Sequence, residues 1–272
     1  MMIRSAVTIA LVPQIKTGPW IFWNDLESSM AKAADLGFDA IELFTASADA
    51  IDPQQLQDLL SHYNLKLAAV GTGAGKVIHG LTLTDPDSNI RKKAAAFIAE
   101  MIDFGAKFGA PAIIGSMQGY VLAQGTLQQS LGWLAEGLEE LGELALSKNA
   151  FLIYEPLNRY ETNLLNSLQA GSEFTDGLQT KGVKLLADLF HMNIEEADLA
   201  KVILEYGKHI GHVHFADSNR KPIGFGHTAM EAIASALKEI DYKGYVSAEA
   251  FPWPDPDVAA AQTIKAFREY FR

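Results

Sequence analysis

Short apolar runs alternate with longer amphipathic segments along this chain, and the alternation predicts its architecture. The apolar runs are rich in Val, Ile and Ala and show little strict alternation with polar residues, which is typical of parallel strands buried on both faces. The segments between them repeat their apolar positions at close to the helical period. Strands are expected at residues 5–11, 39–43, 66–71, 111–115, 151–155, 183–188, 211–216 and 245–249.

Eight strand-then-helix units without a linker predict an α/β fold, a single (β/α)8 TIM barrel. A length of 272 residues suits one such barrel, so a single domain is expected to cover residues 1–272. The alternative is a doubly wound sheet. That fold would place a glycine-rich phosphate loop after the first strand, and the sequence has none there.

Composition narrows the classes of function. The chain has no cysteine, which excludes disulfides, thiolate nucleophiles and Cys-ligated metal sites. The formal net charge of −11 argues against a DNA or RNA partner, because phosphates are repelled. The N-terminal apolar run contains a proline and is too short to span a membrane, so it is interpreted as the first strand. We therefore expect a cytoplasmic protein with no nucleic-acid or membrane partner.

Polar residues close four consecutive strands of the second half. Glu155 ends FLIYE, Asp188 ends KLLAD, His214 ends HVH and Glu249 ends YVSAE. The carboxyl ends of barrel strands share one rim, so these side chains are expected to meet there. Three carboxylates beside one imidazole repel strongly without a cation, which predicts a bound divalent metal. Hard oxygen donors with one borderline nitrogen favour Mn²⁺, with Mg²⁺ or Co²⁺ as alternatives.

Further polar side chains are expected over the same mouth. Glu161, His191 and Arg220 follow the strand ends at short distances, and Glu42 closes the second strand. Singly, Arg220 is equally explained as a surface residue and His191 as a loop cap. Together with a metal, Glu161, His191 and Arg220 are interpreted as hydrogen-bonding groups for a polyhydroxylated ligand. Glu42 points to the same mouth and is a further candidate for a polar contact with the substrate.

Four motifs carry a resemblance to a known family. They are EPLNRYETN, DLFHMNIEE, HVHFADSNR followed by Gly-x-Gly-His, and SAE on the last strand. They resemble the D-tagatose 3-epimerase and D-psicose 3-epimerase family of xylose isomerase-like sugar isomerase and epimerase barrels. The resemblance covers most of the chain and is sharpest from Glu155 to Glu249. GLTLTDPDSNIRKKA and FGAPAIIG also resemble a subgroup that includes 5-keto-L-gluconate epimerase.

The resemblance implies roles for the matching positions. The four strand-end residues would bind the metal, and the two glutamates among them, Glu155 and Glu249, would also serve as acid and base. Substrate contacts are implied at Glu161, His191 and Arg220, and the family implies a homo-oligomer, either a dimer or a tetramer. This chain departs from the family in KPIGFGH after Arg220 and AFPWPDP after Glu249. Both departures lie around the mouth, so they bear on the substrate more than on the chemistry.

The expected reaction inverts the carbon next to a ketone in a free ketose or keto sugar acid. A divalent cation that chelates the carbonyl and the neighbouring hydroxyl oxygen stabilises the enediolate as its charge develops. Glu155 and Glu249 come from strands on opposite sides of the predicted metal, so one can remove a proton and the other return one. An aldose–ketose isomerase needs the same groups and is the alternative.

Two other classes of protein fit the sequence less well. A non-catalytic sugar-binding barrel would lack the acid and base glutamates, and both are present. An endonuclease on this fold would need a cluster of histidines and a basic face. The aromatic residues Trp20, Phe22 and Trp23 are interpreted either as an apolar lid over a sugar or as packing against a helix or a neighbouring subunit.

Overall fold

The barrel predicted from the apolar runs is confirmed. The computed structural model describes residues 2–272, and its parallel sheet runs in the order β2-β1-β3-β4-β5-β6-β7-β8-β9, with β1 also pairing with β9. Within the described residues, β1 and β3 to β9 thus form a closed barrel of eight strands. The strands are β1 (Arg4–Leu11), β2 (Phe22–Trp23), β3 (Ala40–Thr45), β4 (Lys66–Gly71), β5 (Ala112–Ile114), β6 (Leu152–Tyr154), β7 (Val183–Asp188), β8 (Ile210–His214) and β9 (Tyr245–Ala248).

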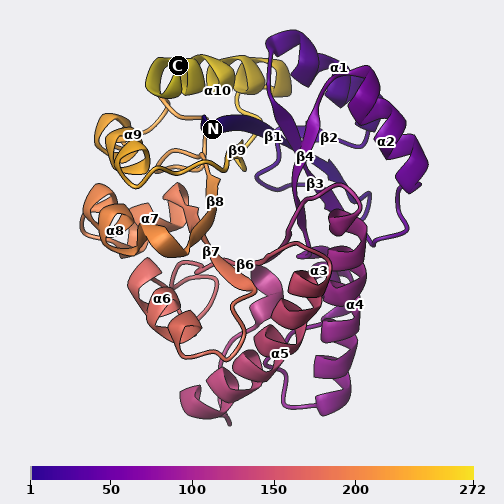
Figure 1. The fold of residues 1–272 in the computed structure, drawn as a ribbon, viewed down its shortest axis with the longest axis vertical. Coiled ribbons are helices and arrows are strands. Elements are labelled where there is room, and N and C mark those ends of the chain that lie inside the picture. The colour runs from indigo at the N-terminus through magenta and orange to yellow at the C-terminus, as the bar shows by residue number, and fades with distance from the viewer. Residues whose placement is uncertain (1) are drawn as a thin grey trace.

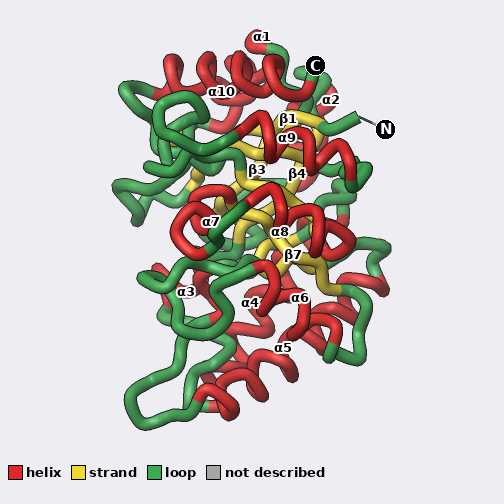
Figure 2. The backbone as a smooth tube through the Cα atoms, turned by 90° about the vertical axis from the view of Figure 1, so that its left-hand side faces the viewer, coloured by secondary structure: helices red, strands yellow, loops and turns green. Residues whose placement is uncertain are grey.

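Helices surround the strands on the outside (Figure 1). Viewed from the side, the N-terminus lies at one end of the barrel and long loops gather at the opposite end (Figure 2). That opposite end is where the strands finish. The helices are α1 (Leu26–Leu36), α2 (Pro53–His62), α3 (Ala74–His79), α4 (Ser88–Ala106), α5 (Leu127–Ser147), α6 (Leu168–Asp176), α7 (Leu189–Glu195), α8 (Leu199–Tyr206), α9 (Met230–Glu239) and α10 (Pro256–Phe271).

The short strand β2 was not predicted. It pairs with the C-terminal part of β1 at Ile9 and Ala10, while β9 pairs with the N-terminal part of β1, residues 4–7. Thr8 links β1 to both neighbours: its hydroxyl donates a hydrogen bond to Ala248 O on β9 at 2.8 Å and accepts one from Ile21 N, just before β2, at 3.1 Å. A two-residue strand has no hydrophobic period of its own, so the pattern of the sequence does not reveal it.

Small and branched apolar side chains fill the space inside the barrel. One cluster joins Ala69, Ile113, Ile153 and Leu186 from four neighbouring strands. Another, made only of alanines and capped by Tyr245, lies nearer the strand starts. With the interior packed in this way, the strand ends above it form the floor of a mouth rather than a pore.

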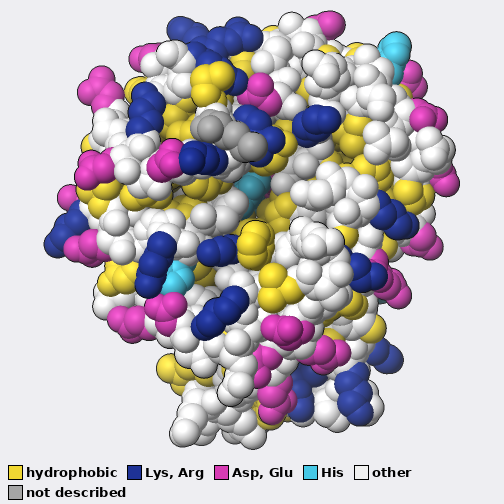
Figure 3. Space-filling view, viewed as in Figure 1, with side chains coloured by type: hydrophobic (Ala, Val, Ile, Leu, Met, Phe, Trp, Pro, Cys, Tyr) yellow, Lys and Arg dark blue, Asp and Glu magenta, His cyan; other side chains and the backbone are white. Residues whose placement is uncertain are grey.

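The charges on one face of the molecule and the character of its helices bear on the predictions about partners. On the face that Figure 3 shows, acidic and basic side chains are interspersed rather than gathered in one basic patch. Over residues 2–272, no helix is both long enough and apolar enough to cross a membrane. The expected absence of a nucleic-acid partner and the cytoplasmic location stay predictions.

Candidate metal centre and active site

The four strand-end residues converge on one nitrogen. His214 Nδ1 lies 3.1 Å from Asp188 Oδ2, 3.3 Å from Glu155 Oε1 and 3.4 Å from Glu249 Oε2. The ligand atoms of all four residues lie within 4.8 Å of one another. Glu155, Asp188 and His214 are buried, whereas the Glu249 side chain keeps 16% of its surface exposed. The structure therefore brings together the set that the sequence predicts.

Main-chain contacts hold two of these carboxylates in place. Asp188 ends β7 and caps α7, because its Oδ1 accepts hydrogen bonds from Phe190 N at 2.8 Å and His191 N at 3.2 Å. Its Oδ2 is left to face His214. Glu155 follows β6, and its main-chain oxygen accepts a hydrogen bond from Gln118 Nε2 at 2.9 Å. Asp188 is thus fixed through its carboxylate, and Glu155 through the backbone that carries it.

Burial and like charges shift the ionisation of this cluster. Burial raises the pKa of Glu155 to about 8; the Glu249 and Asp188 carboxylates add to the shift and His214 opposes it. Burial also raises the pKa of Glu249. Burial alone would lower the pKa of His214, but surrounding carboxylates, Glu249 first, hold it well above its usual range. Asp188 goes the other way: burial would raise its pKa, but the Arg220 guanidinium and nearby imidazoles hold it well below its usual range.

A divalent cation fits this set of residues. Three carboxylates and one imidazole nitrogen are the donors that Mn²⁺ and similar ions accept. The buried Glu155 Oε1 has no hydrogen-bond partner, although it lies close to His214 Nδ1. An unpartnered buried carboxylate oxygen is costly, and coordination would satisfy it. The identity of the metal stays a prediction.

His191 lies beside the cluster, and Asn158 orients its ring from the side that faces away from the mouth. Its Nδ1 is 2.7 Å from Asn158 Nδ2 and accepts a hydrogen bond from Asn158 N at 3.3 Å. Asn158 Nδ2 also donates to Glu161 Oε1 at 2.9 Å. His191 Nε2 is left facing the mouth, 3.8 Å from both Glu155 Oε1 and Asp188 Oδ2. His191 and Glu161 therefore reach the mouth as predicted, and Asn158 links them.

Arg220 approaches the cluster from the loop after β8. Its guanidinium contacts the carboxylates of Glu249 and Asp188 and lies 3.2 Å from His191 Nε2. It is buried, so the interpretation of Arg220 as a surface residue is wrong. Burial alone would lower the pKa of Arg220, but the nearby carboxylates of Asp188 and Glu249 have the larger effect and raise it.

One carboxylate fixes the loop that carries Arg220. Asp217 Oδ2 accepts hydrogen bonds from Gly224 N and Gly226 N, both at 2.8 Å, and Oδ1 accepts from the amides of residues 218 and 228. Arg220 itself has a left-handed backbone, with φ of 57°. Its main-chain oxygen accepts a hydrogen bond from Phe251 N at 2.7 Å. The loop KPIGFGH, which departs from the family, is thus anchored to β8 through Asp217.

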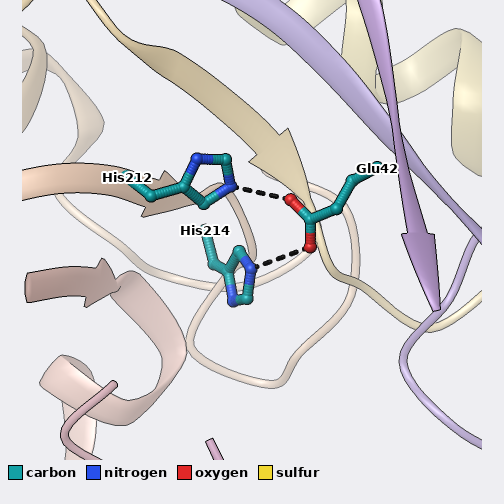
Figure 4. A group of neighbouring side chains, drawn as sticks. All are labelled: Glu42, His212 and His214. Carbon is teal, nitrogen blue, oxygen red and sulfur yellow. Dashed lines mark hydrogen bonds and ion pairs between the residues drawn. The ribbon is translucent and has the colours of Figure 1, made fainter. Parts of the chain in front are cut away.

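Glu42 faces the same cavity, but its two oxygens are occupied. Oε2 lies 2.7 Å from His212 Nε2 and Oε1 lies 3.2 Å from His214 Nε2 (Figure 4). Glu42 is only 4% exposed. Burial alone would raise its pKa, but the two imidazoles hold it well below its usual range. A substrate contact at Glu42 stays a prediction, whereas its contact with His214, a candidate metal ligand, is observed.

A cavity of about 400 Å³ lies above the cluster. Seven of the eight predicted site residues line it, and Asp188 lies buried beneath; the seven are Glu42, Glu155, Glu161, His191, His214, Arg220 and Glu249. Trp20 lines the opposite wall and stacks on Phe44 with ring centroids 4.2 Å apart. Phe22 is buried in the core, and the Trp23 indole donates to Trp20 O. Of the three aromatic residues, Trp20 thus lines the cavity while also packing on Phe44, and a lid role over a sugar stays a prediction.

Three residues of this site were not predicted: Asn158, His212 and Asp217. The signal for His212 was present, because side chains two apart on a strand share a face, so both histidines of HVH point inward. Asn158 and Asp217 act through loop backbone and through side chains distant in sequence. No periodic pattern marks such contacts.

Comparisons with known proteins agree with this geometry. A family model described as xylose isomerase-like TIM barrel matches residues 30–270. A probable ketose 3-epimerase of Synechocystis sp. is 30% identical over 256 residues, which cover 91% of this chain and 88% of that protein. The chain belongs to the ketose 3-epimerase family of xylose isomerase-like TIM barrels. A D-psicose 3-epimerase of Ruminiclostridium cellulolyticum is 31% identical over 236 residues, 84% of this chain and 78% of that protein.

Solved structures show the same fold. The crystal structure of a D-psicose 3-epimerase from Clostridium cellulolyticum H10 with D-tagatose superposes with a TM-score of 0.79 at 24% identity, and the match covers 99% of each chain. The family membership bears out the broader resemblance noted in the sequence. The narrower likeness to a 5-keto-L-gluconate epimerase subgroup stays a prediction.

Proposed function

We propose that this protein is a metal-dependent epimerase that inverts the carbon next to the ketone of a free ketose. The observation that carries this proposal is the pair of glutamates, Glu155 and Glu249, which meet at His214 Nδ1 on the floor of one cavity. They come from β6 and β9, which are separated in the sheet by β7 and β8. Two carboxylates that reach a reacting carbon from different strands suit proton removal on one face and proton return on the other.

The four strand-end residues would hold the ion, with Mn²⁺ preferred and Mg²⁺ or Co²⁺ as alternatives. When bound, the cation would polarise the carbonyl and stabilise the negative charge that develops on oxygen. Glu155 and Glu249 would move the proton. Burial raises the pKa of both carboxyls without metal, which makes each better able to hold a proton than an exposed glutamate. The pair titrates together, and the direction of the reaction decides which glutamate is the base.

Three side chains would hold the sugar above this pair. Glu161, His191 and Arg220 line the cavity and offer a carboxylate, a ring nitrogen and a guanidinium to the hydroxyl groups. Among the described lining residues, Arg220 carries the only fixed positive charge, and Asp188 and Glu249 already neutralise it. A neutral ketose is therefore favoured over a keto sugar acid, whose carboxylate would need an uncommitted cation.

A panel of ketopentoses, ketohexoses and keto-uronic acids, incubated with the Mn²⁺-loaded protein in D₂O, tests the proposal. The epimer of one neutral ketose should accumulate and carry one deuterium at the inverted carbon. A useful control is Glu205→Gln, which removes a carboxylate that is 49% exposed on the outer helix α8 and should leave the rate unchanged. Deuterium at the adjacent carbon, with an aldose as product, would establish the isomerase alternative instead. Turnover of keto acids alone would overturn the preference for a neutral substrate.

Family membership also supports assembly into a dimer or a tetramer. Light scattering coupled to size-exclusion chromatography measures the mass in solution. A monomer at micromolar concentration would contradict this expectation.

A further inference from the structure

Behind the proposed metal ligand His214 lie two buried side chains, Glu42 and His212, that the proposed chemistry does not use. His214 Nε2, on the side of the ring away from the carboxylate cluster, lies 3.2 Å from Glu42 Oε1. Glu42 Oε2 lies 2.7 Å from His212 Nε2. Figure 4 shows each ring directed at a different oxygen of the one carboxylate. Glu42, His212 and His214 are 4%, 1% and 1% exposed, so water does not compete for these contacts.

The contacts between Glu42 and the two histidines cross the inside of the barrel. Glu42 lies on β3 and the histidines on β8, and in the sheet these strands are separated by β1 and β9. Register shifts occur beside both ends of the contact, between Ile41 and Glu42 opposite β4 and between Leu185 and Leu186 opposite β8. At the second shift Gly211 is left out of the pairing, so His212 lies opposite Leu186. This extra residue lies on β8 directly before the two histidines, and such a bulge re-aims the side chains that follow it on its own strand.

The contacts fix which nitrogen of His214 carries the proton. A carboxylate only accepts hydrogen bonds, so a neutral imidazole that faces Glu42 must present an N–H at Nε2. Its Nδ1 then keeps a lone pair directed at Asp188, Glu155 and Glu249. A metal ligand needs that lone pair. His212 takes the second oxygen of Glu42 and so holds the carboxylate in the orientation that serves His214.

We propose that Glu42 and His212 are positioning residues for the metal: Glu42 holds His214 as the Nε2–H tautomer, and His212 holds Glu42. This inference rests on the proposed metal-dependent function. The same three residues also form a candidate second cation site. That reading is less consistent with the geometry, because the carboxylate oxygens point to two different rings, and His214 would have to bind one cation on each side.

Titration of chelator-stripped protein with Mn²⁺ in a calorimeter tests the inference without measuring turnover. Glu42→Gln replaces one acceptor oxygen by an amide donor, so the side chain no longer accepts from both rings. The dissociation constant for Mn²⁺ should rise about 10- to 100-fold, the usual effect of losing a partner of a ligating histidine. The Co²⁺ absorption bands should change in position or intensity as the ligand ring tilts. A purely structural role for Glu42 would not produce that change.

Two further variants separate the role of His212. His212→Gln keeps an N–H for Glu42 Oε2 and should bind Mn²⁺ nearly as tightly as the parent protein. His212→Phe removes the donor and should weaken binding about threefold to tenfold. In the double variant with Glu42→Gln, the His212→Phe change should add nothing, because His212 acts through Glu42. If Glu42→Gln fails to fold, the contrast between the Gln and Phe variants of His212 still decides the question.

Asp39→Asn is the matched control. Asp39 immediately precedes the same strand, β3, at the opposite end of the barrel, and binds Ser5 and Arg272. Its replacement should leave the affinity for Mn²⁺ unchanged. Unchanged affinity in Glu42→Gln, additive losses in the double variant, or a second equivalent of Mn²⁺ that Glu42→Gln abolishes would each overturn the inference. Failure of the parent protein to bind Mn²⁺ would instead refute the proposed metal-dependent function.

Discussion

The two halves of the cavity wall are built from different side chains. The half formed by β6 to β9 and their loops supplies Glu155, Glu161, His191, His214, Arg220 and Glu249. The half formed by β1 to β5 supplies hydroxyls, glycines and apolar or aromatic groups, and within the described lining its one ionisable residue is Glu42. Even Glu42 is committed to the histidines of β8. In the proposed mechanism, proton transfer would occur on the charged side, and the other side would shape the space for the rest of the sugar.

Of the changes to the charged half of the cavity, removal of the metal should reduce the activity most. Without a cation, the charge that develops on oxygen loses several kcal/mol of stabilisation, which corresponds to a rate loss of about 10³-fold or more. Activity should fall with chelator concentration and return on addition of Mn²⁺, and elemental analysis should find one ion per chain. Full activity after complete removal of metal would refute the metal site.

Glu155→Gln and Glu249→Gln should each reduce kcat by at least ~10²-fold, the scale of a general acid or base. Each change keeps the side-chain shape but removes a proton acceptor and one negative charge of the cluster. Circular dichroism should show an unchanged fold, and single-turnover kinetics should locate the loss in the chemical step. A near-normal rate in either variant would mean that another residue carries the proton.

Arg220→Ala should raise KM more than it lowers kcat, because the guanidinium is proposed to hold the sugar in the ground state. Loss of charged hydrogen bonds predicts a rise in KM of about 10- to 100-fold. Arg91→Ala is the matched control. Arg91 donates to Asp85 O on the outside of the barrel, so its loss should leave both constants unchanged. An equal fall of kcat and kcat/KM in Arg220→Ala would assign Arg220 to the transition state instead.

Trp20→Leu tests the apolar half and should have a smaller effect. It removes the ring that stacks on Phe44 but keeps an apolar wall. The smaller side chain should bury about 30–55 Å² less apolar surface against the sugar, worth roughly 0.7–1.4 kcal/mol, so KM should rise about threefold to tenfold with little change in kcat. Trp133→Leu on the outer helix α5 controls for the general cost of losing an indole. A loss of kcat comparable to that of the Glu155 variant would show that the two halves do not divide the work.

Without metal, the carboxylates on the charged half of the cavity lack a balancing cation, so the stability of the protein should depend on pH. In the metal-free protein the pKa of Glu155 is about 8, above its ordinary value of 4.5, so the folded state keeps a proton that the unfolded chain releases. This stabilisation is complete below about 4.5 and is lost as the pH rises through about 8. His214, also raised, acts in the same direction, while Glu42 and Asp188, both lowered, act only at more acidic pH.

Calorimetry of the chelator-stripped protein checks this dependence. Its Tm should fall as the pH is raised across that interval, by about 2–4 °C for each kcal/mol lost. Mn²⁺ should flatten the dependence, and so should Glu155→Gln, which has no proton to lose. A Tm that rises with pH would contradict the assigned shifts.

The local pattern of apolar and polar residues was sufficient to predict the barrel and many of the residues at its mouth. The predicted strands at 66–71 and 183–188 coincide with β4 and β7, and the others agree within a few residues, because a buried parallel strand is a short apolar run that a helix must follow. A polar residue that ends such a run must face the rim. Glu155, Asp188, His214 and Glu249 were therefore identifiable before any distance was known.

Tertiary structure alone decided which atoms meet. Glu42 was expected to contact a substrate, yet its oxygens face two imidazoles on a strand that is not its neighbour. A register shift at Gly211 precedes both histidines on β8, and no residue pattern announces such a shift. Arg220 is buried against Asp188 and Glu249 because Asp217 holds its loop through several backbone amides. The sequence by itself determined which residues stand at the barrel mouth, since strand period and strand end are local properties. Their pairing depends on closure of the sheet, which brings together strands far apart in the chain.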